Sequence, residues 1–526
     1  MKTNKKYVIG IDIGSTNTDA VLVDEGGNVL SYAKAITTSP IHQGVAVALG
    51  GVFKNVENRI DIDKTLVVRA VIGTTQCTNA LLQRQGLCKV GLIRIAGHMP
   101  SILPPCFSWP ENLQKSVLAG SITVNGGFEC DGKEITPLDI DEINAGLDSL
   151  LTNGAESIAV SSVFASLYPE HELEVAKLLD EKFNGKVSYS LSHQIGSIGI
   201  VERENATILN STLMKILKKS FDFSSADKLD NIINAHGINA PIFITQNNGT
   251  IMPIDEALKF PIKTISAGQT NSFIGASKLA GLDNAIIIDI GGTSSDCGMV
   301  LNGFPVKSCT MSTIAGIAMN FQMPDVISIA LGGGSEIKIS GDDVNICSHS
   351  VAKELFKYAK SFGGDILTLT DIGIISGSEV LNLKAKVKVD LDIEGYEKVI
   401  RIAVDKIEEL VRKITVRNDL PIILVGGGAA IIDKKFFNID VILPENFAIA
   451  NAYGAALAEI SHALNTIVSL NERDEILHGL REEALSHVLR RSSDSSSVRI
   501  VEQVITPFSY TPGNLAKVCI TAAGKA

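Results

Sequence analysis

The sequences DIGSTNTDAVLVD (residues 12–24) and DIGGTSSDCGMV (residues 289–300) share the pattern Asp-x-Gly-x-Thr-x-x-Asp. Each copy follows an apolar run and leads into a second apolar run that ends at a Gly- or Asn-containing turn. This pattern predicts a strand, a tight glycine turn and a returning strand. Because the unit occurs twice, the chain is expected to contain two domains built on one plan.

The residue types in these turns suit a polyphosphate. Glycine lets the backbone approach an anion closely, and backbone N–H groups with Thr and Ser hydroxyls can surround a phosphate. An aspartate at a strand end can hold Mg²⁺ or polarise a nucleophile. One such hairpin often has only a structural role, so the prediction depends on two copies facing each other. The expected nucleotide contacts are Gly14, Ser15, Thr16, Asn17, Thr18, Gly291, Gly292, Thr293 and Ser294, with Asp12 and Asp289 as catalytic residues and metal ligands.

A third glycine motif, VGGGAA (residues 425–430), follows an apolar strand and is expected to open a helix. Gly426, Gly427 and Gly428 would let an adenine and ribose lie against the backbone, with the helix N-terminus facing a phosphate. The alternative is a tight strand-to-helix turn without a ligand. The motif fits neither the Rossmann fingerprint nor the Walker A pattern, because the required glycine spacing and the Gly-Lys-Ser/Thr are missing.

Length and composition exclude several classes of function. The chain has 526 residues, more than one core usually accommodates, so two or more domains are expected. Hydrophobic residues make up 45% and charged residues 20%, as in globular proteins. The net charge of −11, without a Lys/Arg cluster, argues against nucleic acid or a membrane surface as partner. A phosphate would therefore be held locally, by backbone amides and a metal ion.

The sequence also predicts a cytoplasmic location. No apolar run reaches the roughly 20 residues of a membrane helix, and the basic start MKTNKKYVIGIDIG is interpreted as a strand rather than a signal peptide. The eight cysteines are scattered without a Cys-x-x-Cys pair, which indicates free thiols in a reducing compartment.

The order of these motifs resembles the actin-like ATPase superfamily. In that resemblance the two aspartate hairpins are the first and second phosphate motifs, and residues 425–430 are the adenosine motif. The small-residue stretches 270–282 and 451–464 stand where the superfamily has two connecting helices that cross at the hinge. The resemblance implies an α/β fold with two ribonuclease-H-like domains, whose mixed sheets flank an interdomain ATP cleft.

Further segments resemble the hydantoinase A / 5-oxoprolinase family along nearly the whole chain. These segments are IGTTQCTNALLQRQG (72–86), SVFASLYPEHE (162–172), ITQNNGTIMP (244–253), ISAGQTNSFIGASKLAG (265–281) and SYTPGNLAKV (509–518). Ser15 stands where many members carry a second glycine, and residues 269–271 replace a stretch that contains proline. The chain is also shorter than the long members. These departures bear on the substrate more than on the ATP site.

The family resemblance implies ATP-dependent opening of a cyclic amide (hydantoin, N-methylhydantoin or 5-oxoproline), by phosphorylation of the amide oxygen. It implies an N-terminal domain over residues 1–195, a hydantoinase A domain over residues 196–526, and ATP with Mg²⁺, with Mn²⁺ and K⁺ as further candidate ions. A B-type subunit and a homo-oligomer are candidate partners. The alternatives are the ATPase subunit of a ketone carboxylase, a small-molecule kinase, and an ATP-switched partner without catalysis.

Two polar turns, residues 73–79 and 245–250, are the candidate substrate contacts. Thr74, Thr75 and Asn79 in the first turn, and Gln246 and Asn248 in the second, can hydrogen bond an imide or carboxylate without net charge; ordinary turn capping by Thr and Asn is the alternative. The charged cluster at residues 202–204 is interpreted as a solvated helix cap, with a substrate role as the alternative. His193 is interpreted as a surface or packing residue.

Overall fold

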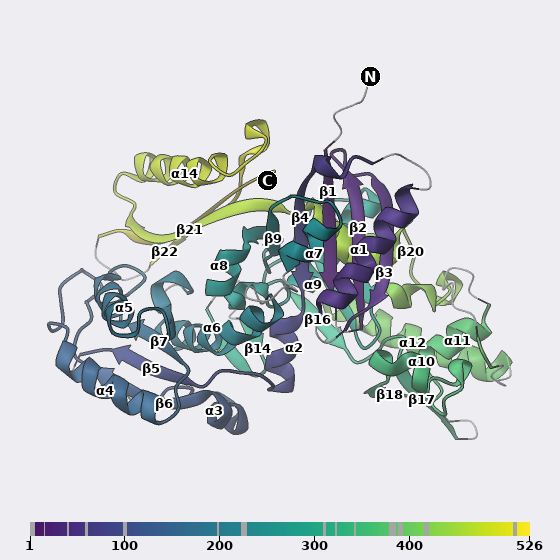
Figure 1. Ribbon diagram of the computed structural model, residues 1–526, viewed down its shortest axis with the longest axis horizontal. Helices are drawn as coiled ribbons and strands as arrows, with labels where there is room; N and C mark the ends of the chain where they lie inside the picture. The colour runs from purple at the N-terminus through teal and green to yellow at the C-terminus, as the bar shows by residue number, and fades with distance from the viewer. Residues whose placement is uncertain are drawn as a thin grey trace.

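The computed structural model describes most of the chain (Figure 1). The described residues are 6–14, 16–38, 41–57, 62–97, 103–196, 199–221, 229–308, 312–320, 323–340, 343–377, 385–387, 393–414, 420–508 and 513–525. Within them the chain has a mixed α/β fold, whose sheets contain nine, six, four, two and two strands. In this part of the chain, no helix is both long enough and apolar enough to cross a membrane.

The largest sheet is built around the first aspartate hairpin. Its strand order is β22-β23-β21-β10-β9-β4-β1-β2-β3. β1, β2 and β3 form an antiparallel meander, β4 is parallel to β1, and β9 is parallel to β4. The sheet joins strands from both sides of residue 195, and the expected domain boundary there stays a prediction. The strands are β1 (Tyr7–Ile13), β2 (Asn17–Asp24), β3 (Val29–Ile36), β4 (Val67–Thr74), β9 (Ile242–Thr245), β10 (Thr250–Pro253), β21 (Glu459–Ser469), β22 (Arg499–Pro507) and β23 (Leu515–Gly524).

The second sheet repeats this plan around the second hairpin. Its strand order is β13-β12-β11-β19-β20. When these five strands are numbered along the chain, their order in the sheet is 3-2-1-4-5. The strands β3-β2-β1-β4-β9 of the first sheet have the same order. The directions also agree: β11 and β12 are antiparallel, whereas β19 is parallel to β11 and β20 to β19. Both hairpins therefore form as the sequence predicts. The strands are β11 (Ala285–Ile290), β12 (Ser295–Leu301), β13 (Phe304–Pro305), β19 (Ile422–Val425) and β20 (Val441–Ile442), with β16 (Val326–Ile329) also paired to β12.

Two helices made of small residues cross between these sheets. They are α9 (Ala267–Ala280) and α13 (Ala450–Leu457). A Cβ on Gly275 would lie 2.0 Å from the carbonyl oxygen of Ala450, and a Cβ on Gly454 would lie 1.9 Å from that of Asn271. The helices approach this closely because neither glycine has a side chain. The second helix is shorter than expected, since residues 459–469 form β21 and pair with β23 along their length.

A separate parallel sheet, in the order β6-β5-β7-β8, lies beside the first one (Figure 1). Its strand β6 and the segment before it have no clear hydrophobic periodicity in the sequence. This segment is nevertheless packed, because Trp109 is only 6% exposed. Its indole N–H donates to Oδ1 of Asn205 over 2.8 Å. The elements are β5 (Val90–Ile95), β6 (Leu118–Val124), β7 (Ser157–Ser162), β8 (Ser188–Leu191), α3 (Glu111–Val117), α4 (Ile140–Thr152), α5 (Glu170–Phe183) and α6 (Ile200–Ser220).

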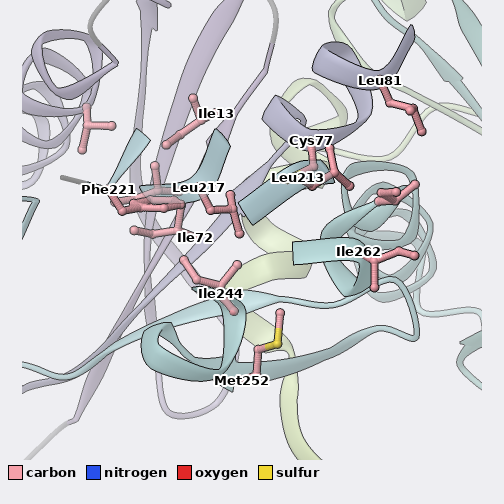
Figure 2. Packing of buried hydrophobic residues seen from close by; sticks show 14 of the residues in the cluster. Ile13, Ile72, Cys77, Leu81, Leu213, Leu217, Phe221, Ile244, Met252 and Ile262 are labelled. Carbon is pink, nitrogen blue, oxygen red and sulfur yellow. The ribbon is translucent and has the colours of Figure 1, made fainter. Parts of the chain in front are cut away.

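The two aspartate-bearing sheets have separate cores. In the first core, Ile13, Ile72 and Ile244 from β1, β4 and β9 belong to the same buried cluster as Leu213 and Leu217 of α6 (Figure 2). The second core surrounds β11, β19 and α12 (Ile393–Ile414). Because helices cover the parallel strands, these strands read as continuous apolar runs rather than as alternating patterns.

The helix crossing makes a direct stability prediction. Gly454→Ala should destabilise the protein by about 1–3 kcal/mol, because the added methyl group overpacks a backbone contact. Gly479→Ala in α14 (Arg473–Leu489) is the matched control, since its methyl group meets no atom within 4 Å. The control should be neutral or stabilising by up to about 1 kcal/mol. Urea unfolding of both variants measures this, and equal midpoints for Gly454→Ala and the wild type would contradict the crossing.

Candidate functional site

The first sheet carries a row of charged residues at the end of β1. In the strand register, Asp12 stands opposite Asp19 on β2, and Asp19 stands opposite Lys34 on β3. On the other side, Asp12 stands opposite Gly73 of β4. Side chains at paired positions share one face of a sheet, so both carboxylates and the ammonium group lie on the same face. The Nζ of Lys34 is 2.9 Å from Oδ2 of Asp19.

The second sheet repeats the pair of carboxylates. Asp289 on β11 stands opposite Asp296 on β12, and opposite Val425 of β19 on its other side. The hydroxyl of Ser328 on β16 donates to Asp296, in the place that Lys34 takes in the first sheet. Both sheets therefore present an aspartate at the carboxyl end of their first strand, next to a parallel neighbour.

The two hairpins approach each other at their turns. A Cβ on Gly292 would lie 3.6 Å from Oγ1 of Thr16, so the two predicted phosphate turns are neighbours in space. The charge of Asp289 is felt at Asp12, where it contributes to a raised pKa. The third glycine motif meets them, because a Cβ on Gly426 would lie 2.1 Å from Oδ1 of Asp289.

Both turns are closed by the same backbone hydrogen bond. The amide of Gly14 donates to the carbonyl of Asn17 over 3.0 Å, and the amide of Gly291 donates to that of Ser294 over 2.9 Å. These are equivalent positions of the sequence repeat, so the repeat extends to the geometry of the turn. Ser15 lies outside the described residues.

The side chains of the turn residues divide into two groups. Thr18 is fully buried, and its hydroxyl pairs with that of Thr37 over 3.0 Å, so it supports the first hairpin from inside. The other predicted contacts are at least partly open to solvent and can reach a ligand; these are Gly14, Thr16, Asn17, Gly291, Gly292, Thr293 and Ser294.

The glycine motif after β19 differs from the expected helix start. Gly427–Ala430 form a 3-10 turn rather than an α-helix, so a full helix dipole does not face this site. Gly428 packs tightly, because a Cβ there would lie 2.5 Å from Cγ2 of Ile290. Gly427 meets no atom within 4 Å of its Cβ position and is exposed. Open backbone beside the second hairpin can accommodate a flat ligand group.

A further glycine run, which the sequence interpretation missed, supports the second turn from behind. The amide of Gly333 donates to the carbonyl of Gly291 over 3.0 Å, and that of Gly334 donates to the carbonyl of Gly292 over 2.8 Å. A Cβ on Gly332 would lie 2.6 Å from the carbonyl carbon of Gly292. The signal was present as ALGGGSE (residues 330–336), which comes directly after the apolar strand β16, but it was not used.

Two asparagines from the crossing helices also reach this site. The Nδ2 of Asn451 on α13 donates to Oδ2 of Asp12 over 3.4 Å. The Nδ2 of Asn271 on α9 donates to Oγ1 of Thr245 over 3.0 Å. A Cβ on Gly73 would lie 2.6 Å from Nδ2 of Asn271 and 3.0 Å from Oδ1 of Asp12. The helix crossing is thus tied directly to the first carboxylate.

Several buried oxygens around Asp12 have no hydrogen-bond partner. Within the described residues these include Oδ1 of Asp12, Asp19, Asn271 and Asn451. Carboxylate and amide oxygens are the ligands that hard cations such as Mg²⁺ prefer. No group of three or more His, Cys, Asp or Glu side chains suited to a metal occurs in this part of the chain. The residues therefore fit an ion that takes its remaining ligands from phosphate and water.

Burial shapes the protonation of both carboxylates. Asp12 is 4% exposed, and desolvation, followed by the charge of Asp19, raises its pKa from 3.8 to about 7. Asp289 is 9% exposed, and burial raises its pKa as well. The carboxamide of Asn451 opposes the shift at Asp12. Since burial disfavours the free carboxylate, the site favours uptake of a proton or a cation.

The charged cluster at residues 202–204 is not a solvated cap. Arg203 and Glu204 are each 1% exposed. Arg94 forms a bidentate ion pair with Glu204, at 2.7 Å from Nε to Oε2 and 2.6 Å from Nη2 to Oε1. The sequence interpretation failed here because Arg94 comes from a strand more than a hundred residues earlier.

Two sequence profiles of one protein family match this chain, one after the other. The sequence profile described as Hydantoinase/oxoprolinase N-terminal region matches residues 8–183, and the profile described as Hydantoinase/oxoprolinase matches residues 203–382. The chain belongs to the hydantoinase/oxoprolinase family.

Individual relatives of this family member are distant. The acetophenone carboxylase gamma subunit of Aromatoleum aromaticum is 28% identical over 409 residues, covering 70% of this chain and 53% of that protein. The caprolactamase subunit alpha of Pseudomonas jessenii is 25% identical over 357 residues, which cover 63% of this chain and 49% of that protein. The chain therefore spans about half the length of these relatives. The solved structure of the ATP-dependent caprolactamase from Pseudomonas jessenii has the same fold, with a TM-score of 0.71, 18% identity and coverage of 99% and 88%.

In this hydantoinase/oxoprolinase chain, the first candidate substrate turn follows β4. Thr74 is 1% exposed and accepts from the amide of Gln76 over 3.2 Å. Thr75 precedes α2 (Gln76–Gln83), and its hydroxyl accepts from Nδ2 of Asn79 over 3.1 Å. These contacts are ordinary turn capping, which was the alternative to a substrate role. Substrate contacts by Thr74, Thr75 and Asn79 stay a prediction.

The second candidate turn follows β9, at the same edge of the sheet. Gln246 donates from Nε2 to Oγ1 of Thr250 over 3.3 Å. Oδ1 of Asn248 accepts from the amide and the hydroxyl of Thr250, over 3.1 Å and 2.6 Å. β4 and β9 follow β1 as parallel strands of the sheet, so both turns lie at the edge that carries Asp12.

The raised pKa of Asp12 predicts a pH-dependent effect of Asp12→Asn. The folded protein holds a proton on this group between its ordinary pKa of 3.8 and its folded pKa of about 7, whereas the unfolded chain does not. Wild-type stability should therefore fall by about 1.4 kcal/mol for each pH unit as the pH rises through this window. The variant, which cannot ionise, should be more stable than the wild type above pH ~8 but not below pH ~4.

Thermal unfolding across this pH range, without nucleotide or divalent ions, measures the effect. Asp283→Asn is the control, because the Asp283 side chain is 67% exposed. A stability difference between Asp12→Asn and wild type that does not change with pH would contradict the raised pKa.

Proposed function

We propose that this chain binds ATP with Mg²⁺ between the two aspartate hairpins and uses it to open a cyclic amide of the hydantoin, N-methylhydantoin or 5-oxoproline type. The observation that carries the proposal is the approach of the two equivalent turns. Thr16 and Gly292 are neighbours, and the charge of Asp289 contributes to the raised pKa of Asp12. Family membership and the fold shared with an ATP-dependent caprolactamase favour an amide over other phosphoryl acceptors.

The proposed function also includes a superfamily assignment for the fold. Two sheets with the same strand order, each with an aspartate at the end of its first strand, support two ribonuclease-H-like domains of the actin-like ATPase type. The family profiles end and begin on either side of residue 195, at 183 and 203, which supports a division there along the sequence. The C-terminal strands then return to the first domain, through β21 and its neighbours.

The residues of the cleft have distinct roles in this proposal. The amides of Gly14 and Gly291 close the two turns, so other backbone amides of residues 14–18 and 291–295 would hold phosphate oxygens, and the open backbone at Gly427 would take the adenosine. Asp12 and Asp289 would hold Mg²⁺, which supplies charge neutralisation between phosphate groups. Mn²⁺ suits the same oxygens, and a role for K⁺ stays a prediction.

The chemistry follows from the poor electrophilicity of an amide. The amide oxygen attacks the γ-phosphorus, so an O–P bond forms and the bond to the leaving ADP breaks. Water then adds to the activated carbon, and the tetrahedral adduct expels the ring nitrogen, which takes a proton, so the C–N bond breaks and an acyl phosphate remains. A second water attacks the acyl phosphate, and the acyclic acid and phosphate are released. Closure about the crossing helices would exclude water that otherwise hydrolyses ATP directly.

A second candidate is the ATPase subunit of a ketone carboxylase, because a relative is an acetophenone carboxylase subunit. Both candidates allow a B-type partner subunit, since each of the two relatives described above is itself a subunit. A homo-oligomer and a cytoplasmic location stay predictions. A small-molecule kinase would differ by releasing a stable phosphorylated product.

Substrate-dependent ADP release distinguishes these candidates. With the chain alone and with a B-type partner, ADP should form in proportion to opened ring when hydantoin, 5-oxoproline or caprolactam is present. ADP release that requires a ketone and bicarbonate would identify a carboxylase subunit instead. A stable phosphorylated product would identify a kinase, and turnover unaffected by any of these compounds would contradict an enzyme of either class.

Asp289→Asn should reduce turnover far more than ATP binding, by at least about a hundredfold in kcat. The substitution keeps the shape of the side chain but removes the charge that faces the phosphates. Isothermal titration with ATP and a steady-state assay measure the two effects, and Asp283→Asn serves as a control, because this exposed residue stands just before β11, the strand that carries Asp289. Equal losses in binding and turnover would contradict the catalytic role.

A further inference from the structure

The first sheet carries a lysine beside the two aspartates of its hairpin, and no step of the proposed chemistry uses its charge. Lys34 lies on β3, an edge strand of the nine-stranded sheet. Its Nζ donates to Oδ2 of Asp19 over 2.9 Å. The Asp19 side chain is 11% exposed, whereas that of Lys34 is 35% exposed. The ion pair therefore has one buried partner and one partner that a ligand can reach.

The Lys34 side chain lies on the face of the sheet that is turned toward α13. Val21 of β2 stands two positions after Asp19 and therefore on the same face. It belongs to one buried cluster with Ala452 and Tyr453 of α13. Because α13 crosses between the two aspartate-bearing sheets, Lys34 lies on the side from which the second sheet approaches.

The same face of β3 is open on both sides of the lysine. Tyr32 and Ile36, two positions before and after Lys34, are 43% and 59% exposed. The opposite face is covered by α1 (His42–Glu57), whose buried residues share the first core with Ala35 of β3. A ligand can therefore approach Lys34 from the side of α13 but not from that of α1.

The strand β3 is tied to the first phosphate turn just beyond the lysine. The amide of Thr37 donates to the carbonyl of Thr16 over 2.9 Å. In the strand register, Ile36 stands opposite Asn17, a residue of that turn. Lys34 is two positions away, which corresponds to about 7 Å along a strand. A lysine side chain covers most of this distance with its flexible four-carbon stem.

The charges around the two hairpins are mostly negative. Asp12 and Asp19 belong to the first hairpin, and Asp289 and Asp296 to the second. Burial raises the pKa of Asp12 and of Asp289, and the positive charge of Lys34 opposes this rise at both. The lysine therefore acts on carboxylates of both sheets. The triphosphate of ATP would bring more negative charge to this place than one Mg²⁺ neutralises, so a further cation is favourable here.

The ammonium group of Lys34 has donors to spare. A lysine has three N–H donors, and among the described residues only Asp19 accepts from this one. The buried carboxylate of Asp19 holds the ammonium group in place and leaves its other N–H groups for a ligand. Charge-assisted hydrogen bonds from such a group to phosphate are stronger than bonds between neutral partners.

We propose that Lys34 binds the terminal phosphate of ATP, while Asp19 holds the lysine in place. In the proposed function the adenosine lies beside Gly427 of the second sheet, so the phosphate chain runs toward the first sheet and its terminal group comes nearest to Lys34. The inference rests on that proposed function and adds to it a residue that distinguishes ATP from ADP. Lys34 would also neutralise charge on the phosphoryl group during its transfer.

Isothermal titration of the full chain with MgADP, and with the magnesium complex of a non-hydrolysable ATP analogue, tests this contact. Lys34→Met removes the charge and should raise the Kd of the ATP analogue about tenfold or more, while that of ADP changes less than about twofold. Lys34→Arg keeps the charge and should recover most of the difference. Lys64→Met is the matched control, because Lys64 forms a 2.9 Å ion pair with Glu57 and its side chain is 30% exposed.

A double variant separates phosphate binding from structural support of Asp19. Lys34→Met alone leaves the Asp19 carboxylate uncompensated, which can disturb the hairpin, whereas Asp19→Asn combined with Lys34→Met leaves no charge to compensate. The double variant should still prefer the ATP analogue over ADP about tenfold less than Asp19→Asn alone does. An equal preference in these two variants would assign Lys34 a structural role only and overturn the inference.

These measurements also separate the inference from the proposed function. An unchanged ratio of the two dissociation constants in Lys34→Met would overturn the contact with the terminal phosphate and leave ATP-driven ring opening standing. An ATP-specific loss in Lys34→Met, in a chain whose ADP release responds to no cyclic amide, would support the contact and refute the ring-opening activity. A wild-type chain that binds neither nucleotide would overturn both.

Discussion

The central physical constraint in this molecule is the burial of two carboxylates, Asp12 and Asp289, on two different sheets whose glycine turns are neighbours. Asp12 and Asp289 are almost without solvent, and each has a second aspartate opposite it on the next strand. Such an arrangement is costly for free anions. It becomes favourable when a cation or a proton balances the charge.

Backbone contacts hold this arrangement in place. The helices α9 and α13 touch through Gly275 and Gly454, and each contributes an asparagine to the first carboxylate's surroundings. The second turn is braced from behind by the glycine run 332–334. Side chains can adopt other rotamers, but the backbone contacts at Gly275 and Gly454 can shift only if α9 and α13 move as well. A change in how α9 and α13 pack would therefore move Asp12 relative to Asp289.

The sequence predicted the parts of the fold that depend on local pattern. Both hairpins follow from apolar runs and glycine turns, and they are present as expected. The close contact of the two small-residue helices was implied by the superfamily resemblance, and it is present although α13 is shorter than expected. The parts that failed depend on partners distant in sequence. Residues 459–469 pair with the C-terminal strand, and the run after β19 packs on Ile290 and stays a 3-10 turn. Arg203 and Glu204 are buried by residues of the parallel sheet, so a cluster that looks solvated became part of a network.

The most direct test of this account is a crystal structure of the full chain with a non-hydrolysable ATP analogue and Mn²⁺, whose anomalous signal locates the ion. The account predicts one nucleotide with its phosphates between the turns at Thr16 and Gly292, its adenosine beside Gly427, and the anomalous peak next to Asp12 and Asp289. A nucleotide bound elsewhere, or an ion without contact to either carboxylate directly or through water, would contradict it.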